Sequence, residues 1–551
     1  MQIYSNKLFK NPQKIIVAFD NESFTSAFRE LENLKEDYYL IGYIRYEAKD
    51  VFLGQKVESK QPLLYFEAFK DFENYLPNKN VKDVFIFPKP KISFGEYKEA
   101  FDKIKTEISN GNTYEVNYTI DFEINTNYSP EEIYSYFLKY QKTPYNAFLQ
   151  NDYETILSFS PELFFRKNGN KIFTKPMKGT VKRGKTLKKD MENIEFLRND
   201  VKNRAENIMI VDLLRNDLGK ISQAGTVKVP KLFEIETHKT LHQMTSEVES
   251  VLKNNITLYD IFNAIFPCGS ITGAPKISTM KIIDDVEKRN RNVYCGAIGI
   301  IYKDFCEFSV PIRILQKPQN ETCYTYRAGG AIVWDSNVDE EWKEAVLKTS
   351  FLSENSKNWR LIETIKTENL IPLLWNEHLD RLKKSAQDLN FVFNDAIPNI
   401  KFDKDGIYRI LLSKNGNFEL QFYPLNKIIT NKISISNKIV NSKDVFLQYK
   451  TTYRPYYEET LSKINAQEIF DEIFFNEKGE LTEGARSNIV LEIGNNLYTP
   501  PISCGLLAGT FRETLLKNNQ IQEKILYKSD LYNASKIYCI NSVRGMRLVQ
   551  L

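Results

Sequence analysis

A lysine that could act as a nucleophile lies in the stretch Lys175–Thr180 (KPMKGT). Lys178 stands there between the apolar Met177 and Gly179. Glycine lets a loop approach a ligand closely, and a lysine held in a partly dry pocket loses pKa and becomes a usable nucleophile. We therefore expect a pocket that lowers the pKa of Lys178. An exposed surface lysine is the alternative for this stretch taken alone.

Several carboxylates follow on a predicted helix, Arg204–Gly219. The apolar residues of this run repeat at a spacing of three to four, which predicts a helix with one buried face; they are Ile208, Val211, Leu214 and Leu218. The same helix carries a heavy polar load, made of Glu206, Asp212, Arg215 and Asp217. A solvated helix face is the alternative.

Two more segments hold carboxylates that could do chemistry. In Ser160–Phe164 (SPELF), Glu162 lies beside a proline turn, sixteen residues before Lys178. A second helix is predicted over Asp339–Phe351, and its three-to-four spacing places three charged residues on one face: Glu341, Glu344 and Lys348. A salt-bridged surface helix is the alternative here.

Elements rich in glycine and other small residues must bring these groups to a ligand. Phe266–Lys276 (FPCGSITGAPK) precedes a predicted helix from about Pro275 to Glu287, and the backbone N–H groups at such a junction suit an anion. The lysine spacing does not fit a Walker motif. Strands with glycine breaks, which allow close ligand approach, are predicted at Tyr294–Gly299, Val310–Arg313 and Ala328–Ser336.

Composition limits the class of protein. A chain of 551 residues is too long for one core, so we expect at least two domains. The net charge of +4 comes without a dense basic cluster, which argues against nucleic acid as a partner. Six cysteines without a CxxC pair and three histidines argue against a zinc site or a disulfide framework. No apolar run reaches membrane-spanning length and no signal peptide is evident, so we expect a cytoplasmic protein without a membrane partner.

A polar stretch without periodicity, 353–359 (SENSKNW), is the predicted linker between a domain at 1–352 and a domain at 360–551. In the second domain, Glu377–Leu389 is predicted to form an amphipathic helix and Ile407–Ser413 a strand. Phe474–Val490 is predicted to form two strands joined by a turn. The stretch that ends at Gly509 and Thr510 opens a helix, which suits a phosphate.

KPMKGT, the acidic helix that follows it and GSITGAPK together resemble the chorismate-utilising enzymes. That family includes anthranilate synthase component I, aminodeoxychorismate synthase component I and isochorismate synthase. The resemblance implies an α+β domain with a β-sandwich core and flanking helices, and residues 1–90 are its weakly matched part. It also implies chorismate as the substrate.

The resemblance implies roles for individual residues. Glu162 would be the general acid and Lys178 the nucleophile. Mg²⁺ would be held by Glu206 and Glu344, with Glu341 beside them, since magnesium prefers oxygen ligands and keeps several waters. The substrate would be bound by His242, Gly269, Thr272, Gly273, Tyr294, Arg313, Gly329 and Lys348. Relatives usually read YQVN where this chain has YEVN, and the effect of Glu115 is left open.

The second half resembles the fold-type IV pyridoxal-phosphate enzymes, which are α+β proteins. Lys450, in KTTYR, would carry the pyridoxal 5'-phosphate, and Glu483 would pair with its pyridine nitrogen. The remaining cofactor-binding residues would be Arg381, Gly509, Thr510, Asn488 and Arg544. KTTYR is more similar to the pattern of aminodeoxychorismate lyase than to that of the aminotransferases, although Tyr453 stands where the lyase usually has asparagine.

Lys178 decides between two readings of the first half, because anthranilate synthase has a small alanine at the matching position. The resemblance implies a bifunctional enzyme that converts chorismate and ammonia to 4-amino-4-deoxychorismate and then eliminates pyruvate to give 4-aminobenzoate for folate biosynthesis. No glutaminase motif is present, so a separate glutamine amidotransferase subunit would supply ammonia, and a homodimer through the second domain is expected. The alternatives are an anthranilate synthase fused to an aminotransferase-like domain, or a synthase with a catalytically dead interaction module.

Overall fold

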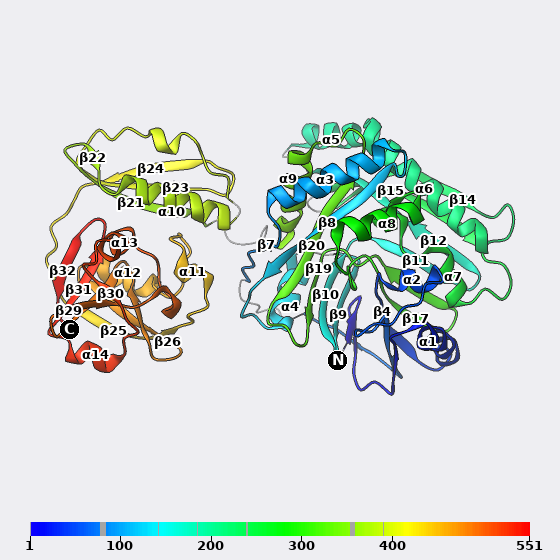
Figure 1. Cartoon of the computed structure of the whole chain (residues 1–551), viewed down its shortest axis with the longest axis horizontal. Helices are drawn as coiled ribbons and strands as arrows, with labels where there is room; N and C mark the ends of the chain where they lie inside the picture. Colours follow the sequence, from blue (N-terminus) through cyan, green and yellow to red (C-terminus); the bar gives the residue numbers. More distant parts are fainter. Residues whose placement is uncertain are drawn as a thin grey trace. The chain divides into compact units, whose positions relative to one another are not determined.

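The computed structural model describes residues 2–77, 84–140, 143–184, 186–238, 241–352, 359–389 and 391–551. The chain divides into two compact units, Met1–Asn355 and Ser356–Leu551, shown in Figure 1. Of the linker predicted at 353–359, only Trp359 lies within the described residues.

Two antiparallel sheets form the centre of the first unit, and each has ten strands within the described residues. The strands of the first sheet, in hydrogen-bonding order, are β16 (Gly273–Ala274), β8 (Glu115–Ile124), β20 (Tyr324–Ile332), β19 (Ile314–Pro318), β10 (Glu154–Ser160), β9 (Tyr145–Gln150), β1 (Gln2–Tyr4), β2 (Lys7–Phe9) and β6 (Glu73–Asn74), with β7 (Lys89–Pro90) paired to β8. Those of the second sheet are β13 (Met177–Lys182), β15 (Leu241–Val251), β12 (Lys171–Lys175), β11 (Leu163–Asn168), β18 (Phe305–Ser309), β17 (Ala297–Tyr302), β4 (Tyr39–Ile44), β5 (Leu64–Phe69) and β3 (Lys14–Ala18), with β14 (Lys228–Thr237) paired to β15.

The two sheets pack face to face, as the alternation of side chains along β9 shows. Ala147 and Leu149 belong to the core cluster that also contains the side chains of the second sheet. Phe148, between them, points to the opposite face and packs with helices. Because successive side chains on a strand point to opposite sides, the first sheet is buried on both faces.

Helices cover the outer faces of this sandwich. Those packed against the first sheet are α3 (Phe94–Ser109), α4 (Pro130–Tyr140), α8 (Lys276–Glu287) and α9 (Val338–Leu347). Those packed against the second are α1 (Asn21–Leu34), α6 (Val201–Ile221) and α7 (Leu258–Ile265). The remaining helical segments are α2 (Ala48–Phe52), α5 (Leu187–Asn199), η1 (Gly269–Ile271) and η2 (Lys348–Leu352). The expected α+β class, with a β-sandwich core and flanking helices, is confirmed.

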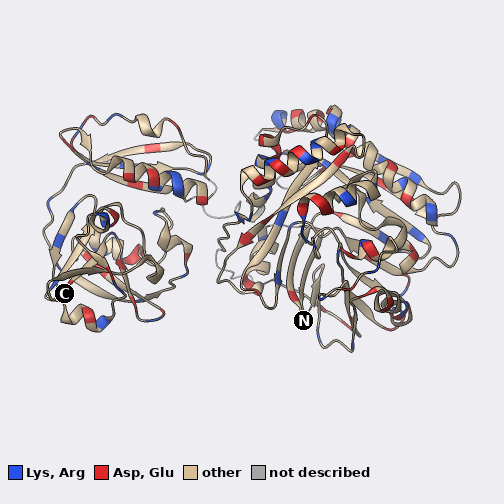
Figure 2. Cartoon of the chain, in the orientation of Figure 1, with Lys and Arg blue, Asp and Glu red and all other residues tan. Residues whose placement is uncertain are grey.

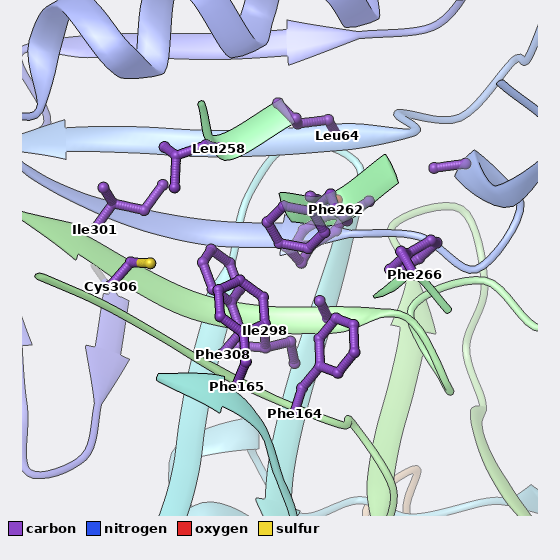
Figure 3. Close-up of a cluster of buried hydrophobic side chains, with 14 of the residues drawn as sticks. Leu64, Phe164, Phe165, Leu258, Phe262, Phe266, Ile298, Ile301, Cys306 and Phe308 are labelled. Atoms are coloured by element: carbon purple, nitrogen blue, oxygen red, sulfur yellow. The ribbon is translucent and has the colours of Figure 1, made fainter. Parts of the chain in front are cut away.

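An aromatic cluster fixes α7 on the second sheet (Figure 3). Phe262 of α7 lies with its ring centre 4.9 Å from that of Phe308 on β18 and 5.3 Å from that of Phe165 on β11. Phe266, directly after α7, contacts Phe164 at 6.2 Å. Edge-on aromatic pairs of this kind add to the stability gained from burial alone, and they anchor the start of the glycine-rich loop.

The predicted helices are present, but several details of the prediction are wrong. The strand predicted at Tyr294–Gly299 begins only at Ala297, as part of β17, and the strand predicted at Ala328–Ser336 ends at Ile332, as part of β20. Val310–Arg313 is not a strand; it connects β18 to β19, and Arg313 has a left-handed backbone with φ 55°. Ile208 is not on the buried face of α6, since 45% of it is exposed, and Ile210 is buried instead. Val211, Leu214 and Leu218 are buried as predicted, and the buried face continues through Asn207, which accepts a hydrogen bond from Ser246.

The second unit contains two further sheets. The smaller consists of β22 (Ile371–Pro372), β21 (Leu361–Glu368), β23 (Gly406–Leu412) and β24 (Phe418–Tyr423), and α10 (Trp375–Asp388) packs on β21. The larger consists of β25 (Ile433–Val440), β26 (Asp471–Asn476), β27 (Leu481–Gly484), β28 (Asn488–Ile493), β29 (Asn496–Thr499), β30 (Gln522–Glu523), β31 (Lys536–Asn541) and β32 (Gly545–Val549). The other helical segments are η3 (Ile397–Asn399), α11 (Val445–Gln448), α12 (Glu458–Asn465), η4 (Ile502–Cys504), α13 (Thr510–Lys517) and α14 (Lys528–Asn533).

Acidic and basic residues are interspersed over the elements of both units (Figure 2), in keeping with the small net charge. Within the described ranges, no helix combines the length and the apolar character that crossing a bilayer requires.

Candidate active sites

The first candidate site is built around Lys178, on β13 of the second sheet. Its Nζ donates a hydrogen bond to Oε1 of Glu115 at 2.9 Å and lies 3.9 Å from Oε2 of Glu206. Glu115 comes from β8 of the first sheet and Glu206 from α6. The lysine is therefore held where both sheets and the acidic helix meet.

Gly179 is required for this placement of Lys178. Its φ is +79°, and a Cβ atom there would lie 2.8 Å from Cγ of Asn203 and 2.9 Å from Cδ1 of Leu197. The pairing of β13 with β15 also shifts register between Met177 and Thr180. An irregularity of this kind re-aims a side chain, here that of Lys178.

The pKa of Lys178 is raised, so the expectation of a lowered pKa is wrong for this structure. Burial alone would lower it, but the neighbouring carboxylates of Glu115, Glu206 and Glu162 outweigh burial. The surrounding negative charge stabilises the ammonium form. The sequence indicated the lysine and its apolar neighbour Met177, but not the number of carboxylates around it.

Glu162 is buried, and burial raises the pKa of its carboxyl group to about 7. Ser270, in the glycine-rich loop, donates a hydrogen bond to Oε1 of Glu162 at 2.6 Å and opposes part of this shift. A carboxyl group that keeps its proton near neutral pH can act as a general acid. Lys178 is close enough to lower the pKa of Glu162 in turn.

The glycine-rich loop packs so closely against β8 and α6 that its glycines leave no room for a side chain. A Cβ at Gly273, whose φ is +141°, would lie 1.9 Å from the backbone oxygen of Glu115, and a Cβ at Gly269 would lie 2.2 Å from Leu213. Thr272 is fully buried and donates to the backbone within its own turn. The small residues of the motif are thus explained by close packing of the loop on β8 and α6.

The three acidic residues assigned to magnesium lie on α6 and α9. A Cβ at Gly330 on β20 would lie 2.9 Å from Oε2 of Glu341 and 3.4 Å from Oε1 of Glu344, so both side chains face this strand. Burial, followed by charge repulsion from Glu344, raises the pKa of Glu341. Burial, followed by charge repulsion from Glu115 and then from Glu344, raises the pKa of Glu206. The pKa of Glu344 itself is lowered because Lys348, at 2.7 Å, outweighs burial.

Mg²⁺ fits this donor set. The mutual repulsion among Glu206, Glu344 and Glu341 is what a divalent cation would relieve, and two carboxylates suffice for an ion that keeps several waters. Among the described residues, no three Asp, Glu, His or Cys side chains form a complete metal-binding cluster.

The other predicted substrate-binding residues lie in different settings. His242 is fully buried, with Nε2 2.9 Å from Asp190 and Nδ1 3.0 Å from Thr237, so both ring nitrogens have protein partners. Lys348 donates to the backbone oxygen of Gly329 at 2.6 Å, next to the acidic cluster. Tyr294 is buried, and burial raises its pKa well above the usual range. Arg313 is near enough to Tyr326 for its charge to lower the pKa of that tyrosine, although burial raises it overall.

The second candidate site is a pocket in the C-terminal unit. It unites six of the seven residues predicted to bind the cofactor: Arg381, Lys450, Glu483, Asn488, Gly509 and Thr510. The seventh, Arg544, is not among its described lining residues; the Nη1 of Arg544 donates to the backbone oxygen of Asn426 at 2.9 Å.

Lys450 lines this pocket and is half-buried, and its partial removal from water lowers the pKa of its amine to about 7. The positive charges of Arg381 and Arg454 lower it further, whereas Glu363 raises it. An amine with such a pKa is partly neutral at physiological pH, as a carbonyl-binding lysine must be.

Arg381, on α10, is held by hydrogen bonds next to the first residues of α13. Its Nε and Nη2 donate to the two carboxylate oxygens of Glu363 at 2.9 and 2.7 Å, and its Nη1 donates to the backbone oxygen of Ala508 at 3.1 Å. A Cβ at Gly509 would lie 2.1 Å from Oδ1 of Asn488. An oriented guanidinium beside a helix N-terminus without a side chain in the way suits a phosphate group.

Glu483 on β27 is buried, and burial raises the pKa of its carboxyl group to about 7. Tyr457 donates to Oε1 at 3.1 Å, while the backbone N–H of Leu507 and Nδ2 of Asn488 donate to Oε2 at 3.2 Å each. This carboxyl group is oriented by three donors, and it can share a proton with a ring nitrogen. Lys450, Arg381 and Glu483 therefore fit pyridoxal phosphate.

Sequence reasoning missed several residues of these two sites. Ser270 lies inside the motif that was recognised, but a serine in a glycine-rich loop gives no separate signal. Glu363 lies in an otherwise apolar strand (LIETI), and an acidic residue there was the available sign of a buried partner for Arg381. Arg454 closes KTTYR and lines the pocket.

Comparisons with known proteins agree with this division of the chain. Residues 73–354 match a family model described as chorismate binding enzyme. Residues 360–551 match a family model described as amino-transferase class IV.

Curated relatives match the first half. The aminodeoxychorismate synthase component 1 of Salmonella typhimurium is 37% identical over 258 residues, which is 46% of this chain and 56% of that protein. The protein of the same name from Bacillus subtilis is 35% identical over 46% of this chain and 53% of its own length. The anthranilate synthase alpha subunit 2 of Arabidopsis thaliana, a chloroplastic protein, is 35% identical over 47% of this chain and 44% of its own length. The chain thus spans about half the length of the curated relatives it matches.

Solved structures share the fold of the first unit. Anthranilate synthase component I from Streptococcus pneumoniae superposes with a TM-score of 0.56 at 22% identity, over 63% of this chain and 92% of that one. The menaquinone-specific isochorismate synthase of Escherichia coli superposes with a TM-score of 0.52 at 15% identity, over 64% and 87%.

Proposed function

The chain belongs to the chorismate binding enzymes and carries a class IV amino-transferase domain behind that part, and from this we propose that it makes 4-aminobenzoate from chorismate in two steps. The first unit adds ammonia to chorismate to give 4-amino-4-deoxychorismate. The second unit eliminates pyruvate from that product. Such an enzyme would serve folate biosynthesis in the cytoplasm.

One observation carries the first step: Lys178, whose side chain is only 12% exposed, lies near Glu162, a carboxyl group whose pKa burial raises to about 7. Lys178 first gives up the proton that its raised pKa retains, for which the hydrogen-bonded carboxylate of Glu115 is an acceptor. The neutral amine then attacks C2 of the ring, the ring double bond shifts, and the C4 hydroxyl leaves as water with the proton of Glu162. The carboxylate of Glu162 regains a proton from the nitrogen that is added at C4 in the next step. Ammonia then attacks C4, and the bond to Lys178 breaks as the double bond shifts back. The lysine is regenerated, so it acts as a covalent catalyst.

Glu206 and Glu344, with Glu341 beside them, would hold Mg²⁺ in this unit. The ion would neutralise the ring carboxylate of chorismate and so stabilise the electron-rich transition state that forms when the amine adds to the ring. Ser270 keeps the carboxyl group of Glu162 oriented toward the cluster.

In the second unit, pyridoxal phosphate would supply an electron sink when bound. Lys450 would take the proton from C4 of the ring as a base, which its pKa of about 7 suits. Glu483 would hold the pyridine nitrogen, and Arg381 with the backbone at Gly509 and Thr510 would hold the phosphate. Loss of the C4 proton and of the enolpyruvyl group leaves an aromatic ring and pyruvate.

Ammonia would come from a separate glutamine amidotransferase subunit, as the words "component 1" in the names of the relatives imply for those proteins. A homodimer through the second unit is part of the same proposal. The competing function is an anthranilate synthase joined to an aminotransferase-like domain, and anthranilate synthases are among the relatives. The presence of Lys178 favours the first function.

Product identification tests the proposal. Purified protein is incubated with chorismate, ammonium, Mg²⁺ and pyridoxal phosphate, and the products are separated and weighed by mass spectrometry. We expect 4-aminobenzoate and pyruvate in equal amounts. Anthranilate as the product would overturn the first step, and 4-amino-4-deoxychorismate without 4-aminobenzoate would overturn the second.

A further inference from the structure

Three arginines form a cluster next to the pocket in the second unit; one of them, Arg486, lines the pocket, and Arg544, which was expected to bind the cofactor, is not among the residues that line it. The three arginines are Arg486, in the turn between β27 and β28, Arg544, in the turn before β32, and Arg547, on β32. Arg486 lines the pocket directly and is solvent-exposed, so it stands where a ligand can reach it.

The contacts of this arginine cluster tie its three members together. The guanidinium carbons of Arg486 and Arg547 lie 4.7 and 5.3 Å from the centre of the same ring, that of Phe470. The backbone N–H of Arg544 donates to Oδ1 of Asn541 at 2.8 Å, and Nδ2 of Asn541 donates to the backbone oxygen of Arg486 at 3.4 Å. Asn541 also lines the pocket.

The arginine cluster lacks matching negative charge. In the part of the chain that the structure describes, none of its three guanidinium groups forms a salt bridge, in contrast to Arg381, which is paired with Glu363. Asp471 is the nearby acid, but its carboxylate accepts hydrogen bonds from the backbone N–H groups of Glu472, Ala485 and Arg486. Burial and the neighbouring arginines lower the pKa of Arg544, as expected where like charges crowd together.

The phosphate of the cofactor does not explain this cluster. Arg381, on α10, is fixed against the residues that open α13, and those elements supply the site for a phosphate. Arg486 comes instead from the β27–β28 turn and lies beside the turn at Asn541. A second anionic group on the same ligand is the simplest source of the missing charge, because an arginine binds a carboxylate through two parallel hydrogen bonds.

We propose that Arg486, flanked by Arg544 and Arg547, binds a carboxylate of the substrate at the mouth of this pocket and makes the second unit select for dicarboxylates. The inference rests on the proposed function, since 4-amino-4-deoxychorismate carries one carboxylate on the ring and one on the enolpyruvyl group. A substrate with a single carboxylate would leave the cluster uncompensated.

Steady-state kinetics of the holoenzyme with 4-amino-4-deoxychorismate tests the role of Arg486. For Arg486→Gln we expect KM to rise about tenfold or more, as for loss of a charge-assisted hydrogen bond, with a much smaller change in kcat. Arg486→Lys keeps the charge without the paired hydrogen bonds and should fall between the two. Lys478→Gln, an exposed residue of the β26–β27 turn, removes the same charge elsewhere and should leave KM as it is. An unchanged KM in Arg486→Gln would overturn the proposal.

A binding measurement separates this inference from the proposed function. Isophthalate carries two carboxylates on a ring, and benzoate carries one. Calorimetric titration of the holoenzyme should give tighter binding of isophthalate than of benzoate, and Arg486→Gln should remove the difference. If the wild-type protein has no lyase activity but shows this difference, the carboxylate site stands and the proposed reaction fails. Equal binding of both compounds to the wild type would overturn the carboxylate site, whatever the lyase activity.

Discussion

Each unit holds a lysine that is largely withdrawn from solvent, and the surroundings of the two lysines differ in the sign of their charge. Lys178 lies among Glu115, Glu206 and Glu162, and its pKa is raised. Lys450 lies among Arg381, Arg454 and Arg409, and its pKa falls to about 7. Burial is the largest single influence on both, and it acts in the same direction on both.

The difference teaches that burial alone does not make a lysine nucleophilic. In the second unit, burial and neighbouring arginines act together, so the amine is prepared before any ligand arrives. In the first unit, the carboxylates oppose burial and keep the ammonium form. Glu206 belongs to the proposed magnesium site, and Glu115 accepts a hydrogen bond from the lysine. Binding of a cation and an anionic substrate would therefore change the charge around Lys178, and with it the pKa of the amine.

The largest effect is expected from Lys450→Ala. We expect loss of 4-aminobenzoate formation by at least about 10³-fold, because the variant loses both the attachment point of the cofactor and the base. Absorption spectroscopy of protein incubated with pyridoxal phosphate and then dialysed should show no visible band. A band as in the wild type would mean that another lysine carries the cofactor. Formation of 4-amino-4-deoxychorismate should persist as an internal control.

Lys178→Ala tests the other lysine. Removal of the nucleophile leaves Glu162 and the glycine-rich loop in place, so the fold should survive while 4-amino-4-deoxychorismate formation falls by about 10²-fold or more. Ammonia could then attack C2 in the vacated space and give an anthranilate-type product, which liquid chromatography would detect. Wild-type rates in this variant would make the lysine a bystander and favour the anthranilate synthase reading.

How much of this comparison the sequence could predict differs between the two units. The position of Lys178 and the helix with Glu206 followed from spacing and glycine placement. The charge around Lys178 did not, because Glu115 is 63 residues away along the chain and reaches the lysine only when the two sheets stack. In the second unit, Arg381, Lys450 and Glu483 were assigned by motif, whereas Glu363 has no motif and is recognised only by its contacts.

Two details of the fold were also beyond the sequence. Val310–Arg313 has the composition of a strand, yet Arg313 adopts a left-handed backbone that no local pattern indicates. The buried face of α6 includes Asn207 because Ser246, on a distant strand, donates a hydrogen bond to it. Tertiary partners decide both cases, and pattern analysis considers neighbours in sequence only.

Glu206→Ala and Glu344→Ala test whether these carboxylates bind Mg²⁺ in the first unit and leave the second unit unaffected. Each variant removes one of two anionic ligands, so we expect the Mg²⁺ concentration needed for half-maximal consumption of chorismate to rise by about tenfold or more. Lyase activity on supplied 4-amino-4-deoxychorismate should remain at the wild-type level. Full synthase activity in both variants at limiting Mg²⁺ would show that the ion is bound elsewhere.

Glu115→Gln makes the surroundings of Lys178 less negative without changing the size of the side chain. We expect the pKa of Lys178 to fall. The limb of the pH–rate profile on which the rate rises as Lys178 loses its proton should then move toward lower pH by about one unit. Glu321→Gln, an exposed change in the same unit, serves as the control. A profile identical to the wild type would mean that Glu115 positions the lysine without setting its charge.

The smallest effect concerns stability. The pKa of Glu162 is raised from 4.5 to about 7 in the folded protein, so the folded state binds a proton that the unfolded state releases between these values. The contribution of this group to the free energy of unfolding is therefore complete below pH 4.5 and is lost as pH rises to about 7. Urea unfolding of the wild type and Glu162→Gln at pH 5 and pH 8 should show a steeper loss of stability for the wild type. Parallel curves would contradict the raised pKa.

The fully buried Arg291 affects the conformational entropy cost of ligand binding. Its guanidinium donates to the backbone oxygens of Ile271 and Asn117 at 2.8 and 2.6 Å and pairs with Glu287 on α8. The loop between α7 and α8 is thereby fastened in the free protein. Ordering the ten residues between α7 and α8 on binding would cost roughly 10–20 kcal/mol of backbone conformational entropy, more than the about 8 kcal/mol that micromolar affinity represents. With the loop already fixed, that cost was met during folding, and the free energy of each new contact can appear as affinity.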